Sequence, residues 1–130
     1  MYYLKTYPVS FFIIIIICYL SLFKPPQTEL DSIPHIDKLV HLCMYGGLTC
    51  IIWTEYLYHH KTINAKRLVF AGILLPICMS GMIEIIQATC TDNRSGDWFD
   101  FLANTLGVII ATILVRYIIQ PFMKKHIHKE

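Results

Sequence analysis

Four apolar runs separated by short polar links constrain this chain more than any other feature of its sequence. The last three runs, residues 39–58, 68–88 and 98–119, each have about the 20 residues that an α-helix needs to cross a bilayer. The first, residues 9–23, is shorter, and Tyr7 and Pro8 extend it. The pattern predicts an all-α fold, a polytopic membrane protein with a bundle of about four transmembrane helices, near residues 8–24, 39–58, 68–88 and 98–119.

The composition agrees with a chain in lipid. Of 130 residues, 55% are hydrophobic and only 15% are charged, which favours one domain embedded in a bilayer. A net charge of +2 is far below the basic field that a nucleic-acid-binding protein needs, so we expect no nucleic acid partner. Four of the five cysteines lie in apolar runs, where they pack as small hydrophobic residues, and no disulfide framework is readable.

The basic residues that flank the runs predict the orientation. Because the links are short, consecutive helices should be antiparallel neighbours. Eight basic residues then fall on one side and three on the other: Lys5, Lys61, Lys66, Arg67, Arg116, Lys124, Lys125 and Lys129 against Lys24, Lys38 and Arg94. The positive-inside rule therefore predicts an integral membrane protein with both termini in the cytoplasm. No small-residue cleavage site follows the first run, so we expect a retained helix rather than a signal peptide.

Small residues and one carboxylate give local expectations inside the bundle. Ala103, Gly107 and Ala111 recur every fourth residue and should let another helix approach closely, as should the pair Gly46 and Gly47. Pro76 should kink the third helix. Glu55, near the cytoplasmic end of the second helix, is expected to pair with a basic residue of the adjoining link, and it is assigned no function: the candidates are Lys61, Lys66 and Arg67.

Polar residues gather at the outer ends of three helices. At helical spacing, those of the second run share one face, as do the pair that ends the third run and those that begin the fourth. These three sets are Asp37, Lys38, His41 and Tyr45; Glu84 and Gln87; and Asp97, Asp100 and Asn104. The three faces therefore meet at one depth of the outer leaflet, where an unpaired carboxylate costs several kcal/mol and indicates a functional site.

This cluster is open to three interpretations. In the favoured one, Asp37 or Asp100 orients His41 for proton transfer, with Glu84 as the acid or base partner. A divalent cation is the less favoured alternative, with His41, Glu84, Asp97 and Asp100 offering ligands of suitable chemistry but no sequence-local metal motif. In the structural interpretation, basic residues neutralise the carboxylates and fix the helix register: these are Lys38 and Arg94.

The same positions carry a family resemblance over residues 37–111. DKLVHLCMYGGL (37–48), EIIQ (84–87) and NRSGDWFDFLANTLGVIIA (93–111) are similar to the motifs of VanZ-like membrane proteins. The family pattern D-K-x-x-H-x-x-x-Y, E-x-x-Q and R-x-x-x-x-x-D-x-x-x-N-x-x-G falls on Asp37, Lys38, His41 and Tyr45, on Glu84 and Gln87, and on Arg94, Asp100, Asn104 and Gly107. The resemblance implies a small helical membrane protein from a family whose namesake is associated with reduced susceptibility to the glycopeptide teicoplanin.

Two function hypotheses follow. The first is an enzyme that acts on a lipid-linked or cell-envelope substrate, with His41, Glu84 and Asp100 as catalytic candidates. The remaining cluster residues would then bind the substrate: Asp37, Lys38, Tyr45, Gln87, Arg94, Asp97 and Asn104. The second is a binding or scaffold protein that contacts an envelope protein or an amphipathic ligand. The lipid bilayer is the expected surrounding in both, and a transporter is disfavoured because four short helices leave little room for alternating access.

Overall fold

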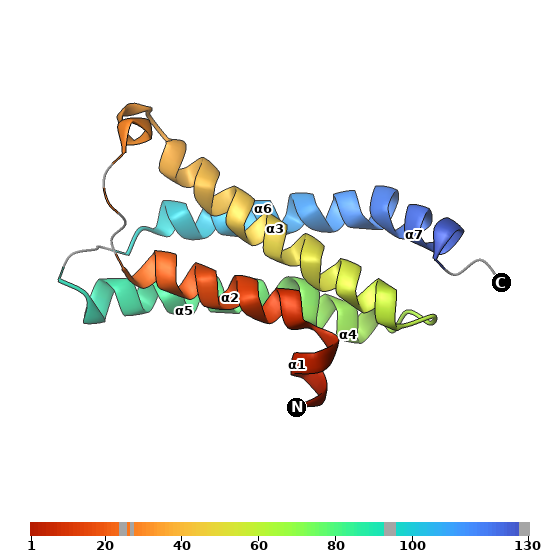
Figure 1. Ribbon diagram of the computed structural model, residues 1–130. Coiled ribbons are helices and arrows are strands. Elements are labelled where there is room, and N and C mark those ends of the chain that lie inside the picture. Colours follow the sequence, from red (N-terminus) through yellow and green to blue (C-terminus); the bar gives the residue numbers. More distant parts are fainter. Residues whose placement is uncertain (24–25, 27, 93–95, 128–130) are drawn as a thin grey trace.

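The computed structural model describes residues 1–23, 26, 28–92 and 96–127, and every regular element in these residues is helical (Figure 1). The elements are α1 (Tyr2–Thr6), α2 (Pro8–Leu22), the 3-10 turn η1 (Glu29–Ser32), α3 (Ile36–His59), α4 (Ala65–Val69), η2 (Phe70–Leu74), α5 (Leu75–Cys90), α6 (Trp98–Leu114), η3 (Val115–Ile119) and α7 (Gln120–His126). The helix α4 continues through η2 into α5, and α6 continues through η3 into α7. The predicted all-α bundle is confirmed.

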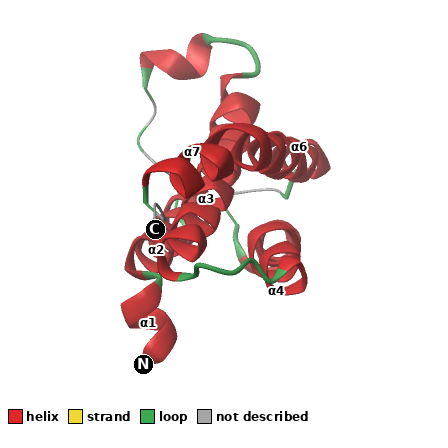
Figure 2. Cartoon of the chain, turned by 90° about the vertical axis from the view of Figure 1, so that its right-hand side faces the viewer, coloured by secondary structure: helices red, strands yellow, loops and turns green. Residues whose placement is uncertain are grey.

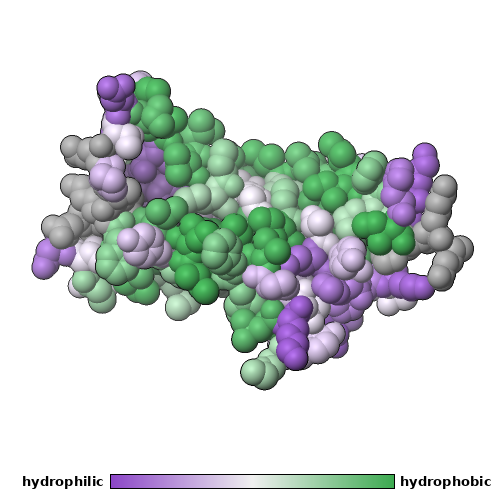
Figure 3. Space-filling model, in the orientation of Figure 1, coloured by the Kyte–Doolittle hydropathy of each residue, from purple (hydrophilic) through white to green (hydrophobic). Residues whose placement is uncertain are grey.

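Three of these continuous helices are long and apolar enough to cross a membrane. They are Ile36–His59, Ala65–Cys90 and Trp98–His126, with 24, 26 and 29 residues. Figure 3 shows a hydrophobic surface around the middle of the bundle and hydrophilic residues toward its two ends. The chain is thus an integral membrane protein. With 15 residues, α2 is about 22 Å long against a hydrocarbon layer of about 30 Å, so a fourth crossing stays a prediction.

Polar side chains cap two of the long helices at their N-termini. The Asn64 side chain accepts a hydrogen bond from the backbone N–H of Arg67, which begins α4 before the apolar run. In the same way the Asp97 side chain accepts from the N–H of Phe99 at the start of α6. Side-chain caps satisfy backbone donors that a helix leaves unpaired at its N-terminus. The Asn64 cap lets its helix begin at Ala65, before the apolar run 68–88, whereas α6 begins with its run at Trp98.

Each internal proline follows a widened turn. The π turn η2 precedes Pro76, and the π turn η3 precedes Pro121. Proline lacks an N–H and its ring crowds the carbonyl four residues earlier, and a π turn relieves both problems by shifting the hydrogen-bond register. The irregularity predicted at Pro76 therefore takes the form of a π turn that lets the helix continue.

Glycines set the closest helix crossing, between α3 and α6. A Cβ atom on Gly107 would lie 2.2 Å from the carbonyl oxygen of Leu42, and one on Gly46 would lie 3.1 Å from the carbonyl oxygen of Gly107. The two backbones are thus in direct contact, as small residues allow in membrane helix packing. Gly47 was expected to share this function, and here the prediction is wrong, because a Cβ there would meet no atom within 4 Å. It faces away from α6 because adjacent residues of a helix point about 100° apart.

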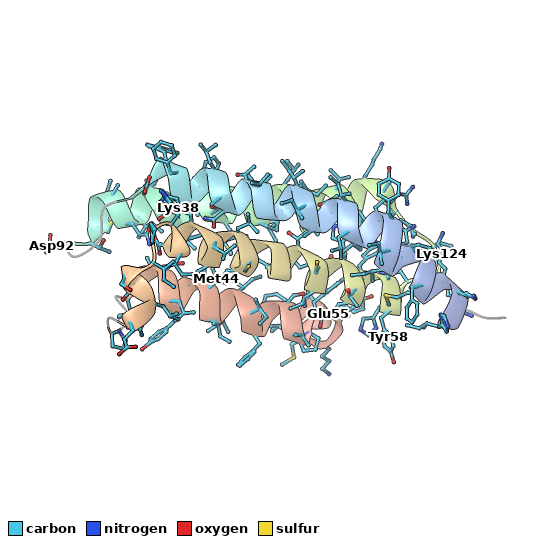
Figure 4. The ribbon with its side chains drawn as sticks, turned by 90° about the horizontal axis from the view of Figure 1, so that it is seen from above. Lys38, Met44, Glu55, Tyr58, Asp92 and Lys124 are labelled. Atoms are coloured by element: carbon cyan, nitrogen blue, oxygen red, sulfur yellow. The ribbon has the colours of Figure 1, made fainter. Side chains whose placement is uncertain are left out.

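Helix α3 lies between α2 and the α6–α7 helix, as Figures 2 and 4 show from the end and from above. The Glu55 side chain of α3 caps the N-terminus of α2. Its two carboxylate oxygens accept hydrogen bonds from the backbone N–H groups of Val9 and Ser10 at 2.9 and 3.0 Å, and from the Ser10 hydroxyl at 2.5 Å. A carboxylate at a helix N-terminus is also favoured by the helix dipole. The sequence did not suggest these partners for Glu55.

Candidate functional site

The start of α3, the end of α5 and the start of α6 meet at one end of the bundle. Figure 4 places Lys38 and Asp92 at this end, and Tyr58 and Lys124 at the opposite end. His41, Glu84 and Asp100 are all buried here, with exposed fractions of 5%, 3% and 9%. The structure therefore brings together the three residues that the sequence nominates as catalytic candidates, one from each helix.

Lys38 joins α3 to α6 through two carboxylates. Its Nζ atom donates to Asp97 Oδ2 at 2.9 Å and to Asp100 Oδ1 at 2.6 Å. The hydrogen bond from Lys38, together with that from the N–H of Phe99, holds the pKa of the Asp97 carboxyl below its ordinary value of 3.8. Lys38 thus places one positive charge between the two carboxyl groups, as charged groups near a membrane require.

His41 lies beside two carboxylates. Its Nε2 atom is 3.8 Å from Asp37 Oδ1 and 3.6 Å from Asp100 Oδ2. These distances are too long for hydrogen bonds but short enough for the carboxylates to stabilise a positive charge on the imidazole. Its other nitrogen, Nδ1, is buried and has no hydrogen-bond partner within the described part of the chain. This nitrogen can therefore exchange a proton with a bound molecule.

Glu84 offers a second buried and unpaired atom. Its Oε2 atom accepts a hydrogen bond from the backbone N–H of Asp97 at 2.8 Å, while Oε1 has no partner among residues 1–23, 26, 28–92 and 96–127. Glu84 interacts electrostatically with both His41 and Asp100, so it belongs to the same cluster. Gly96 makes this arrangement possible, because a Cβ there would lie 2.4 Å from the Glu84 carbonyl oxygen. The chain leading into α6 thus packs directly on the end of α5.

A further polar layer lies one helical turn deeper in the bundle. Asn104 is 1% exposed, and its Nδ2 atom donates to Ser80 Oγ at 2.7 Å. The buried Tyr45 hydroxyl lies near Ser80 and interacts with Cys18 of α2. Ser80 was not nominated from the sequence, although its position four residues before Glu84, on the same face of the helix, is the signal that could have found it.

Gln87 stands apart from the ion-pair cluster, and the position of one other nominated residue is not described. The Gln87 side chain donates from Nε2 to the carbonyl oxygen of Ser21 at 2.6 Å, so its amide holds the end of α2 against α5. Arg94, nominated for substrate binding and for charge compensation, lies outside the described residues. In the described residues, the charges of Asp97 and Asp100 are compensated by Lys38, one of the two basic residues that the structural interpretation named.

Three residues of the cluster lie close enough together to act as ligands of a metal cation. One ligand atom from each of Asp37, His41 and Asp100 lies within 4.8 Å of the others. Carboxylate oxygen and imidazole nitrogen suit zinc, manganese or magnesium. However, Asp97 and Glu84 are engaged by Lys38 and by a backbone N–H. The ammonium group already supplies a positive charge to Asp100 at 2.6 Å. The geometry thus favours an ion-pair network centred on lysine over the four-ligand set considered from the sequence.

Comparisons with known proteins give one result. A family model described as VanZ/LLP1 matches residues 5–120 of the chain, which include every residue of the cluster. The resemblance found in the three motifs is thereby confirmed and extended toward both termini. Neither the curated proteins nor the solved structures give a match.

Proposed function

The chain belongs to the VanZ/LLP1 family, and on that premise we propose that it is an enzyme of the bacterial cytoplasmic membrane that acts on a lipid-linked or cell-envelope substrate. The observation that carries the proposal is a pair of buried, unpartnered groups in one charged cluster: the Nδ1 atom of His41 and the Oε1 atom of Glu84, each without a partner in the described ranges. A buried polar atom without a partner costs about 1–3 kcal/mol, and such atoms persist where a ligand or water satisfies them.

The proposed chemistry is proton transfer by His41 and Glu84. The carboxylates of Asp37 and Asp100 face the Nε2 edge of the imidazole, so they would stabilise the protonated ring after Nδ1 takes a proton from a nucleophile. Glu84 would exchange the second proton through Oε1. In this arrangement Lys38 would hold Asp100 in position through its ion pair at 2.6 Å, and it would not act on the substrate itself. Hydrolysis or group transfer are the reactions that such a pair supports.

The location of the cluster favours a substrate held in the membrane. Large apolar side chains next to it are exposed, among them Leu39, Trp98, Phe99 and Leu102, with exposed fractions between 54% and 67%. In a bilayer these side chains contact lipid, so a substrate with a lipid chain can reach the cluster from the side. We place the cluster at the outer leaflet, because Lys5, Lys61, Lys66, Arg67, Lys124 and Lys125 all belong to the opposite side of the predicted topology.

An effect on glycopeptide susceptibility would follow if the substrate is an envelope precursor.

A second candidate function is a binding or scaffold protein without catalysis. The ion pairs that join Lys38 of α3 to Asp97 and Asp100 of α6 favour it, because they hold two helices together as a structural network does.

The test compares His41→Ala with His59→Ala in the full-length chain. His59 is an exposed histidine at the other end of the same helix, so it controls for loss of an imidazole and for expression. Folded membrane abundance and teicoplanin susceptibility are scored for each variant, and Glu84→Gln is scored alongside. The enzyme is supported if His41→Ala and Glu84→Gln lose the phenotype at normal abundance while His59→Ala keeps it. Lost abundance supports the structural candidate, and an unchanged phenotype in all three refutes a working site.

A further inference from the structure

A cavity of about 440 Å³ lies between the N-terminal segment and the helix formed by α4, η2 and α5. Its walls come from α1, the first half of α2, the second half of α3 and the start of the α4–α5 helix. This is the half of the bundle opposite Lys38, so the cavity is separate from the polar cluster. Its volume is within the range of about 300–1,000 Å³ that small-molecule sites occupy.

The inner wall of the cavity is apolar. Phe11 and Ile14 of α2, Ile52 of α3 and Leu75 of α5 line it. Two further lining residues, Phe70 and Ala71, belong to the π turn η2. A π turn widens a helix locally and recurs at binding sites, and here it shapes one wall. Such a surface fits a hydrocarbon chain.

The outer wall carries hydrogen-bond donors and a positive charge. Arg67 lines the cavity, and its guanidinium group has no ion-pair partner in the described part of the chain. His60 stacks on the Tyr56 ring at 4.4 Å, and its Nδ1 atom lies 3.1 Å from the Tyr56 carbonyl oxygen. Since a carbonyl can only accept, Nδ1 carries the proton in this hydrogen bond, so Nε2 of the neutral ring is an acceptor that a hydroxyl group of a ligand could meet, and the phosphate would be bound by other residues.

Tyrosines complete this wall. Tyr2, Tyr3 and Tyr7 line the cavity together with Arg67, and the rings of Tyr2 and Tyr3 pack edge to face with their centroids 5.5 Å apart. Each phenol can donate a hydrogen bond to a phosphate oxygen. The carboxylate of Glu55 accepts hydrogen bonds from the cavity residue Ser10, and the backbone N–H groups of Val9 and Ser10 engage both of its oxygens. An anion would therefore meet an unpaired guanidinium group and several hydroxyl donors.

We propose that this cavity is a binding site for one anionic glycerophospholipid, with the phosphate at Arg67 and an acyl chain along Phe11, Ile14 and Leu75. A guanidinium group pairs with phosphate through parallel hydrogen bonds, and the apolar wall continues from it into the bundle. A free phosphate would leave that wall without a ligand. The basic residues of this end, including Lys5 and Lys66, attract the anionic lipids of the leaflet that the orientation assigns to them. The site does not depend on any reaction at the polar cluster.

The test measures lipids retained by the full-length chain. The protein is purified in a neutral detergent, mixed with phosphatidylglycerol or phosphatidylcholine of the same acyl chains, and examined by native mass spectrometry. We expect retention of phosphatidylglycerol in preference to phosphatidylcholine. Arg67→Gln should weaken phosphatidylglycerol binding about tenfold, which is the scale of one charge-assisted contact.

Lys66→Gln is the matched control. Lys66 precedes Arg67, is exposed and does not line the cavity, so this variant removes the same charge from the same helix turn. It should bind phosphatidylglycerol almost as the unmodified chain does. Equal losses in the two variants would show a diffuse charge effect and overturn the site. Equal retention of phosphatidylcholine, or displacement of the lipid by millimolar inorganic phosphate, would also overturn it.

The apolar wall is tested independently with Ala71→Phe, which fills the cavity from the π turn while leaving Arg67 in place. It should lower the binding of phosphatidylglycerol although the charge is kept. Far-UV circular dichroism and size-exclusion chromatography verify folding, and Ala71→Leu replaces the variant if phenylalanine disrupts the helix. Undiminished binding in a folded cavity-filling variant would refute an acyl-chain site.

Discussion

The crossing of α3 and α6 gives a prediction whose magnitude follows from the structure. In Gly107→Ala the new Cβ would lie 2.2 Å from the Leu42 carbonyl oxygen, whereas ordinary contact begins at 3.4 Å. One helix must therefore shift by about 1.2 Å, and the obstacle is backbone, which cannot rotate away. Overpacking of this kind costs about 1–3 kcal/mol or more, and the gain in helix propensity from Gly to Ala, about 1 kcal/mol, offsets only part of it.

Gly47→Ala is the matched control because its Cβ meets no atom within 4 Å. It should stabilise the chain by up to about 1 kcal/mol through helix propensity alone. Because the gain in helix propensity is common to both variants, we expect Gly107→Ala to be less stable than Gly47→Ala by the overpacking cost, about 1–3 kcal/mol. The free energy of unfolding is measured by sodium dodecyl sulfate titration in mixed micelles, followed by the fluorescence of the buried Trp53. Equal stabilities would refute direct backbone contact between α3 and α6.

The same variant should disturb the polar cluster. Leu42 follows His41 in α3, and Gly107 lies one turn after Asn104 in α6. A shift at this crossing therefore changes the distance between His41 Nε2 and Asp100 Oδ2, which is 3.6 Å. Any effect of the chain on teicoplanin susceptibility should therefore be weaker in Gly107→Ala and unchanged in Gly47→Ala, compared at equal membrane abundance.

Three further predictions concern charged groups. Glu55→Ala should destabilise the chain by about 1–3 kcal/mol in the same titration, because it leaves the Ser10 N–H and hydroxyl at the start of α2 without their acceptor; an unchanged free energy would contradict the cap. Since the folded state lowers the pKa of Asp97, the contribution of its pair with Lys38 is complete above about pH 4 and is lost as pH falls further; Asp97→Asn should flatten this acid limb of the stability profile. Addition of EDTA should leave the thermal unfolding midpoint unchanged because Lys38 already supplies the positive charge, whereas a fall that zinc or manganese reverses would indicate a metal at His41.

Glu55 illustrates what the sequence could not provide. Its position near the end of an apolar run predicted a basic partner in the adjoining link, with Lys61, Lys66 and Arg67 as candidates. The partners are the backbone N–H groups of Val9 and Ser10, more than forty residues earlier in the chain. Backbone donors are present at every residue and leave no mark in the sequence, so only the packing of α2 on α3 could reveal them.

The sequence by itself determined the helices, their membrane character and the nomination of His41, Glu84 and Asp100. This was possible because apolar length and helical periodicity are local properties, and because short links force polar helix ends to one depth. Tertiary structure alone decided which groups pair at that depth. In that structure Lys38 pairs with Asp97 and Asp100, and the Gln87 side chain donates a hydrogen bond to the end of α2. One atom of His41 and one of Glu84 have no hydrogen-bond partner among the described residues. The physical reason is that such pairing depends on differences of about an ångström between helices, here fixed by the contact of Gly46 and Gly107.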